Sequence, residues 1–155
     1  MIVIRITINK DGLARLQNFT QGKCLIKGAL RDIVREGGRT LRDNILKRYD
    51  AEVDPDGAAW HPLSPATRKR KGGRGKMLVE SGRLRHSIKI HPQGRYKVSI
   101  RPEGHRNERV GAFHQFGRPS IPTRPFLGIS PSDILQIETL ALARIRQLIH
   151  SDGGS

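Results

Sequence analysis

The chain has 155 residues, 35% of them hydrophobic and 5% aromatic, which is enough for a single domain with a modest, mainly aliphatic core. Its formal net charge of +15 favours an anionic partner, either nucleic acid or an acidic protein surface. The single cysteine, Cys24, excludes an internal disulfide framework and a cysteine-based zinc site, and no apolar run approaches the roughly 20 residues of a membrane-spanning helix. We therefore expect a protein made in the cytoplasm that has no contact with membranes.

The first 50 residues predict a strand and a long helix. Every second residue from Ile2 to Ile8 is an isoleucine, the period of a half-buried strand, and a short helix is expected over residues 13–19. From Leu25 to about Tyr49, apolar residues recur at steps of three and four while the other face is basic, which predicts one long amphipathic helix. The pair Gly37-Gly38 in its middle is interpreted as a tolerated weak spot, with a bend or a close helix crossing as the alternatives.

Residues 52–76 show little periodicity and are predicted to form an extended basic arm. Residues 54–57 indicate a turn, and Ser64-Pro65 suits the start of one helical turn. Residues 64–86 hold eight lysines and arginines against one acid, so they contribute +7 of the net charge. Glycines would keep the arm flexible, and its cations suit phosphates or an acidic protein, with a solvated surface loop as the alternative. The six cations of the arm are Arg68, Lys69, Arg70, Lys71, Arg74 and Lys76.

The second half of the chain predicts a hairpin and a C-terminal helix. A short helix is expected over residues 77–84, ending near Gly82, and strands over 87–91 and 97–101 would form the hairpin. Ser130 and Asp133 form a capping signal for a helix that runs to about residue 150, and residues 151–155 are expected to fray. We therefore predict an α+β fold over residues 1–150, with a small antiparallel sheet packed against the long helix and the C-terminal helix.

Large apolar groups mark the points where loops should be fixed to the core. The stretches 114–117 and 121–128 together contain two prolines and two glycines that restrict the backbone, so we predict a rigid connector over residues 114–128. Phe116, Phe126 and Leu127 are all expected to be buried in it. Trp60, the only tryptophan, is expected to bury its ring and to anchor the arm.

Reactive groups are too scattered to predict catalysis or metal binding. No two of the six histidines stand four residues apart, the spacing that places two metal ligands on one helical face. A phosphate-binding loop at Gly75-Lys76 fails, because its leading glycine is replaced by Arg70 and its final serine or threonine by Met77. Ser81 lacks the glycine context of a hydrolase nucleophile. We expect no catalytic residues, no metal and no cofactor.

A series of landmark residues stands over residues 54–128: Pro55, Gly57, Trp60, Leu63, Leu78, Ser81, Gly82, Leu84, His114, Gln115, Phe116, Gly117, Pro122, Arg124, Pro125, Phe126, Leu127 and Gly128. Their order and spacing resemble the phage virion morphogenesis family, the Mu-like and P2-like tail-completion proteins. One departure is Val110-Gly111, where family members often carry Tyr-Ala.

The resemblance implies a structural component of a tailed phage or prophage that acts late in assembly. Such proteins lie at the head-proximal end of the tail or in the neck, as a homo-oligomeric ring, commonly sixfold, through which double-stranded DNA passes. Their implied partners are the connector or stopper, the tail terminator and the tail tube, and their implied location is the head–tail junction of the virion. They have no known cofactor or catalytic residues.

These expectations lead to one hypothesis and two alternatives. Subunits would form the ring through residues 114–128 and the long helix, and the basic arm would reach the DNA channel or an acidic neighbouring ring. The first alternative is a stand-alone basic protein that coats nucleic acid, which predicts strong, salt-sensitive DNA affinity for the monomer. The second is a small phage endonuclease, for which the clustered acids and histidines are lacking.

Overall fold

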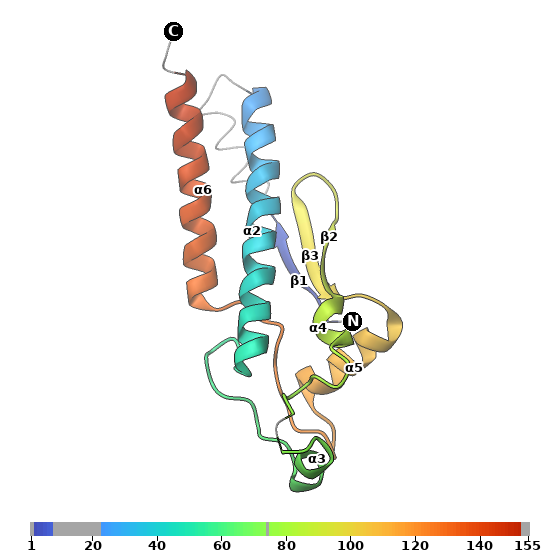
Figure 1. The fold of residues 1–155 in the computed structure, drawn as a ribbon. Helices are drawn as coiled ribbons and strands as arrows, with labels where there is room; N and C mark the ends of the chain where they lie inside the picture. The colour runs from blue at the N-terminus through green and yellow to red at the C-terminus, as the bar shows by residue number, and fades with distance from the viewer. Residues whose placement is uncertain (1, 8–22, 74, 153–155) are drawn as a thin grey trace.

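The computed structural model describes residues 2–7, 23–73 and 75–152, and it has the predicted α+β fold (Figure 1). The helix expected over residues 13–19, Arg74 and the last three residues lie outside the described residues. No helix in the described ranges carries an apolar stretch long enough to cross a bilayer. The elements in chain order are β1 (Ile4–Thr7), α2 (Lys23–Ala51), α3 (Pro65–Arg70), α4 (Arg83–Ser87), β2 (Ile88–Pro92), β3 (Lys97–Pro102), α5 (His105–Phe116) and α6 (Pro131–Asp152).

The sheet, α2 and α6 form three successive layers, with α2 in the middle (Figure 1). The strands are antiparallel in the order β1-β3-β2, and Ile100 of the central strand faces Ile4 on one side and Ile90 on the other. The hairpin predicted for β2 and β3 is confirmed to within a few residues. Helix α6 runs back along α2 in the opposite direction, so the two form an antiparallel pair.

The core lies where the C-terminal half of α2 meets the sheet and the loops. Tyr49 is 1% exposed, and its ring packs edge-on against Trp60 and Phe126, with centroid distances of 5.4 and 5.7 Å. The indole nitrogen of Trp60 donates a hydrogen bond to the Pro125 carbonyl at 2.8 Å. The prediction that Trp60 anchors the loop is therefore confirmed, and aromatic edge-to-face pairs of this kind add stability beyond the area they bury.

Gly37 and Gly38 mark close packing, so their interpretation as a tolerated weak spot is wrong. A Cβ on Gly37 would lie 3.4 Å from Ile137 of α6, and a Cβ on Gly38 would lie 2.9 Å from the Cγ2 of Val98 in β3. The two adjacent glycines therefore let α2 approach a helix on one side and the sheet on the other.

Two further sequence predictions are wrong in the middle of the chain. Residues 77–82 form turns instead of a helix, and Gly82, in the left-handed region with φ of 70°, precedes α4 instead of ending a helix. The basic arm is not extended, since α3 occupies its centre and a bridge joins Val53 to Ala59. The helical turn expected after Ser64 is confirmed, because the Ser64 side chain accepts a hydrogen bond from the Thr67 amide.

The start of α6 follows the predicted capping box. The Ser130 amide donates to the Asp133 carboxylate at 2.8 Å, and the Asp133 amide donates to the Ser130 hydroxyl at 3.1 Å. The apolar residues of α6 are not all buried, because Ile134 and Ile149 are 50% and 54% exposed while Ile137 packs against the core.

Candidate functional site

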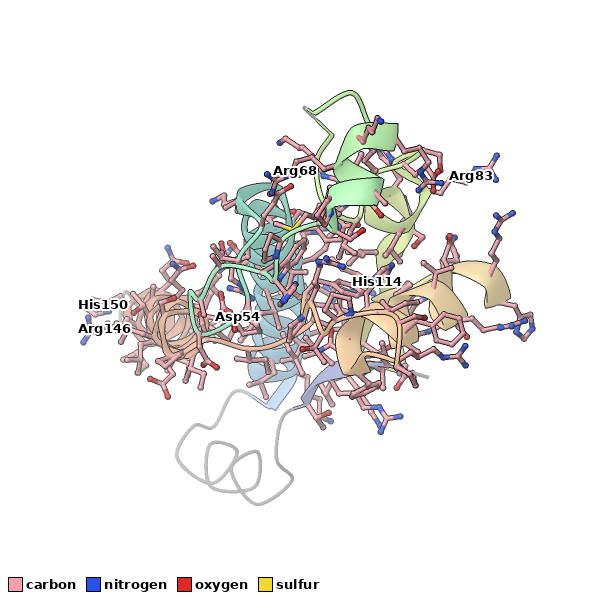
Figure 2. All side chains as sticks on the ribbon, turned by 90° about the horizontal axis from the view of Figure 1, so that it is seen from below. Asp54, Arg68, Arg83, His114, Arg146 and His150 are labelled. Carbon is pink, nitrogen blue, oxygen red and sulfur yellow. The ribbon has the colours of Figure 1, made fainter. Side chains whose placement is uncertain are left out.

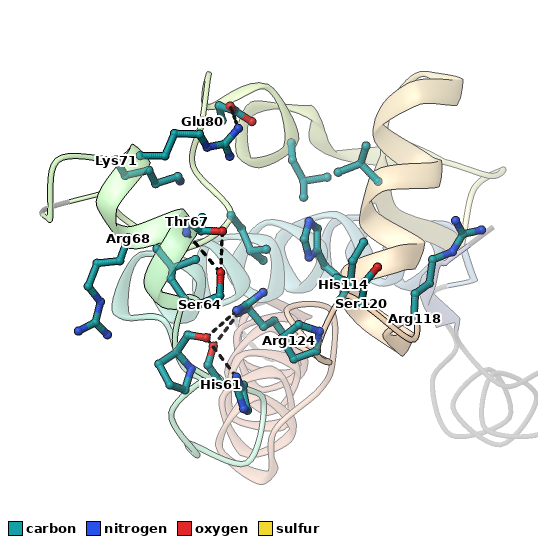
Figure 3. Close-up of a pocket in the computed structure, with 18 of the residues that line it drawn as sticks. His61, Ser64, Thr67, Arg68, Lys71, Glu80, His114, Arg118, Ser120 and Arg124 are labelled. Atoms are coloured by element: carbon teal, nitrogen blue, oxygen red, sulfur yellow. Dashed lines mark hydrogen bonds and ion pairs between the residues drawn. The ribbon is translucent and has the colours of Figure 1, made fainter.

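A basic groove of about 1400 Å³ opens on the surface between α3 and α5 (Figure 3). One side is formed by residues 61–73, which include α3, and the opposite side by α5 together with residues 118–124. Residues 78–84 complete the lining. The groove therefore joins residues 61–84 to residues 106–124, which follow them after a gap of about 20 residues.

The lining carries eight lysine and arginine residues against one acid, Glu80. Glu80 pairs with Arg70 at 3.7 Å, and both side chains are mostly exposed, so water weakens this pair. Figure 2 shows that Arg68 and Arg83 lie well apart from Arg146 and His150 of α6. The eight cations are Arg68, Lys69, Arg70, Lys71, Arg83, Arg106, Arg118 and Arg124.

The structure divides the six cations of the predicted arm. Arg68 to Lys71 line the groove, whereas Lys76 does not and Arg74 lies outside the described residues. The ammonium group of Lys71 donates to the carbonyls of Lys76 and Val79 at 2.9 and 2.8 Å, so its charge fixes the turn that follows α3. Within the described chain, no ion pair involves Arg68 or Lys69, which are both exposed.

Three cations of the groove were missed by the reasoning from the sequence: Arg83, Arg106 and Arg118. A signal for part of this set was present, because Arg106, Val110, His114 and Arg118 follow one another at steps of four, which places them on one side of α5 and its continuation. The Arg118 guanidinium lies 3.6 Å from the centre of the Phe113 ring, a cation–π contact that holds it at the end of α5.

Arg124 is charged but points inward, and it organises one wall of the groove. It is 5% exposed, and it donates to the carbonyls of His61 and Pro62 at 2.8 and 3.0 Å. Burial lowers the pKa of its guanidinium, against the opposing effect of the Glu52 carboxylate. Arg124 therefore fastens the loop before α3 to the connector, and its hydrogen-bonding groups are directed to the protein.

His114 faces the groove from α5 (Figure 3). Burial, followed by the charge of Arg124, lowers the pKa of its imidazole below the ordinary value of 6.5, so the ring is neutral at pH 7. Its buried Nδ1 has no hydrogen-bond partner within the described part of the chain. Nor do the described residues contain a group of three or more His, Cys, Asp or Glu side chains that could hold a metal ion.

The predicted connector is fixed by one amide side chain. Gln115 accepts hydrogen bonds from the backbone amides of Phe126 and Leu127 at 3.1 Å, and it donates to the Leu127 carbonyl at 2.8 Å. Phe126 and Leu127 are buried as predicted. The prediction for Phe116 is wrong, since it is 71% exposed. Gln115 points inward, and the next residue of a helix is rotated by about 100° away from it.

Most of the motif residues gather around the groove or the core beside it. Gly57 and Gly117 take positive φ values of 85° and 74°, and Gly128 packs so closely on Pro55 that a Cβ there would clash with the proline ring. The motif residues that line the groove are Leu63, Leu78, Ser81, Gly82, Leu84, His114, Pro122 and Arg124.

The chain is similar to known proteins. The model of the phage virion morphogenesis family matches residues 10–146. The chain belongs to this family. It is 30% identical over 123 residues to Mu-like prophage FluMu G protein 1 of Haemophilus influenzae, covering 76% of this chain and 81% of that protein. It is 27% identical over 126 residues to tail completion protein S of Escherichia phage P2, covering 72% of this chain and 81% of that protein. No solved structure matches the chain. The resemblance predicted from residues 54–128 is thus confirmed, and the match reaches well beyond them.

Proposed function

We propose that this virion morphogenesis protein is a structural, non-enzymatic component that completes the phage tail at the head–tail junction. In this proposal its subunits form a ring around the DNA channel, and the basic groove contacts the phosphates of the DNA that passes through. The family match and the name of the P2 relative support the tail-completion role. The observation that carries the DNA contact is the convergence of eight cations and one acid on a single groove.

The exposed cations of the groove suit contact with phosphates. Arg68, Lys69, Arg83 and Arg106 are exposed, and none of them forms an ion pair with another described residue. Flexible cationic side chains bind the phosphate backbone without reading bases, and such contacts weaken with salt. Sequence-independent contact of this kind would let DNA slide through a channel.

The test compares two variants that lose the same amount of charge. The groove variant replaces Arg68, Lys69, Arg83 and Arg106 by glutamine. The matched control replaces four exposed cations of α2 by glutamine, namely Lys27, Arg35, Arg39 and Lys47. Each is supplied to a phage that lacks this gene, and infectious particles are counted. The purified proteins are also titrated with double-stranded DNA at several salt concentrations.

We expect the groove variant to produce few infectious particles and to lose most of its low-salt DNA affinity, while the control retains both. Equal losses in the two variants would indicate that net charge alone matters, as in a stand-alone protein that coats nucleic acid. Normal particle yields from the groove variant would reject the role of the groove. Electron microscopy of labelled virions would test the ring, and virions without this protein would reject the whole proposal.

A further inference from the structure

Helix α6 exposes a line of large apolar side chains on its outer side. Leu135, Leu142 and Ile149 are 65%, 55% and 54% exposed, although each is a residue type that is usually buried. They are seven residues apart, so they lie along one stripe of the helix that drifts by only about 20° per step. The stripe is about 21 Å long, given a rise of 1.5 Å per residue.

This stripe lies on the side of α6 that faces away from α2. The side of α6 that packs on the rest of the protein carries Ile137, Leu140 and Ala141. Each residue of an α-helix is rotated by about 100° around the helix axis from the one before. Leu135 and Leu142 therefore lie about 140–160° around that axis from Ile137 and Leu140, on nearly the opposite side of α6. Within the described chain nothing covers the stripe, and α6 forms the outer layer of the molecule (Figure 1).

The charge of α6 suits a second copy of this chain. The protein carries +15, so most of its surface would repel another copy. The surface of α6 is different, since Arg144 pairs with Glu36 of α2 at 3.0 Å and the exposed Glu138 and Arg146 carry opposite charges. Two copies can therefore approach through α6 without the repulsion that their other surfaces would cause.

The positions of Glu138 and Arg146 favour one orientation. Both flank the stripe, four residues before and four residues after Leu142, and neither forms an ion pair with another described residue of its own chain. In an antiparallel pair centred on Leu142, Glu138 of each copy faces Arg146 of the other, and Leu135 faces Ile149. A parallel pair would instead place Glu138 beside Glu138 of the other copy and Arg146 beside Arg146 of the other copy, so that like charges would meet.

We propose that α6 pairs with α6 of a second copy in an antiparallel arrangement, with the two-fold axis at Leu142. Such a contact is self-complementary, because the same stripe is used on both copies. It closes as a dimer and does not by itself generate a ring. The proposal is therefore independent of the DNA contact and of the ring proposed above, and a ring built from such dimers would need a second surface.

The first test measures the mass of the full chain by analytical ultracentrifugation over a range of concentrations. We expect the wild-type protein, whose chain has a mass of 17.4 kDa, to form dimers as its concentration rises. Leu142→Glu should weaken the pairing at least about tenfold, because it places two like charges at the centre of the contact. The matched control is Ala143→Glu, which adds the same charge at an exposed position about 100° around the helix and should leave the pairing unchanged.

The second test exchanges the flanking charges and does not depend on the apolar stripe. Glu138→Arg alone and Arg146→Glu alone each create two like-charge contacts, so each should weaken the dimer. Glu138→Arg together with Arg146→Glu restores opposite charges across the axis and should recover the wild-type mass. Circular dichroism of each variant checks that the monomer fold is retained.

Several results would overturn the proposal. One is a wild-type protein that stays monomeric at every concentration. Another is an equal loss of dimer affinity in Leu142→Glu and in Ala143→Glu. A double exchange that fails to restore the pairing lost in the single exchanges would reject the antiparallel register.

Discussion

Arg48 of α2 forms a largely buried ion pair with Asp133 at the start of α6. The distance from Nη1 to Oδ2 is 2.8 Å, and the Asp133 side chain is 1% exposed. Arg48 also donates to the Gly128 carbonyl at 2.9 Å, and Asn44 donates to the second Asp133 oxygen at 2.8 Å. The Asp133 carboxylate thus joins the C-terminal helix to the long helix, and Arg48 adds the connector to the same cluster.

Loss of this carboxylate should destabilise the protein strongly. Asp133→Ala leaves Arg48 buried without its partner and removes the cap of α6, so we expect a loss of about 3–5 kcal/mol in the free energy of unfolding. The control is Asp43→Ala, which removes an exposed pair with Arg42 and should cost less than about 1 kcal/mol. Urea denaturation monitored by circular dichroism measures both. Equal losses would show that the buried pair contributes little.

The same carboxylate should make the free energy of unfolding depend on pH in the acidic range. Burial acts to raise the pKa of Asp133, but hydrogen bonds from Ser130 and Asn44 and the charge of Arg48 outweigh it, and the pKa lies below its ordinary value of 3.8. The unfolded chain therefore binds a proton at a higher pH than the folded chain. The stabilisation is complete above about pH 5 and is lost as the pH falls through 3.8 to the folded pKa. The stability difference between wild type and Asp133→Asn should shrink over that window, and a difference that grew there would contradict the assignment.

The two phenylalanines of the connector region should respond very differently to truncation. Phe126 is fully buried against Tyr49, so Phe126→Ala should cost about 3–5 kcal/mol. Phe116 is 71% exposed, so Phe116→Ala should change stability by no more than about 0.5 kcal/mol. Thermal unfolding of the two variants gives the comparison. A large loss from Phe116→Ala would mean that its ring is covered in solution.

The sequence predicted those elements whose periodicity is set by local burial. The alternating isoleucines of β1, the apolar steps of α2 and the capping box of α6 all appear where expected, because each pattern depends on a single element facing one core. The family was also recognisable, since motif residues such as Gly57, Trp60 and Gly128 fix turns and loop anchors in this chain.

Side-chain direction at the ends of elements was harder to predict. Nothing local to Phe116 says that Gln115, next to it, would turn inward to hold the connector. The groove was found only in part, because its cations come from three segments that tertiary packing brings together. Lys71 was wrongly grouped with freely available charges, since its carbonyl partners become close only when the turn after α3 forms.

Two glycines of α2 should give opposite results when replaced by alanine. At Gly38 the new methyl group would lie 2.9 Å from Val98, which is β-branched and buried in the sheet and so has little room to move. Overpacking of about 1–3 kcal/mol should outweigh the gain in helix propensity of about 1 kcal/mol. At Gly28 nothing lies within 4 Å, so Gly28→Ala should stabilise the protein by about 1 kcal/mol. Melting temperatures that moved in the same direction would argue against the tight contact between α2 and β3.

Gln115 should be hard to replace even by residues of similar size. Its carboxamide satisfies two backbone amides and one carbonyl of the connector, so Gln115→Leu leaves three backbone groups without their partner. Gln115→Glu keeps the acceptor for the two amides but loses the donor, and it sets an oxygen against the Leu127 carbonyl. We expect both variants to lose stability, by at least about 1–3 kcal/mol for Gln115→Leu, because unsatisfied buried polar groups are costly. Urea denaturation measures the loss, and hydrogen exchange at Phe126 and Leu127 locates it. Unchanged protection of those two amides in Gln115→Leu would show that the connector is held by its apolar anchors alone.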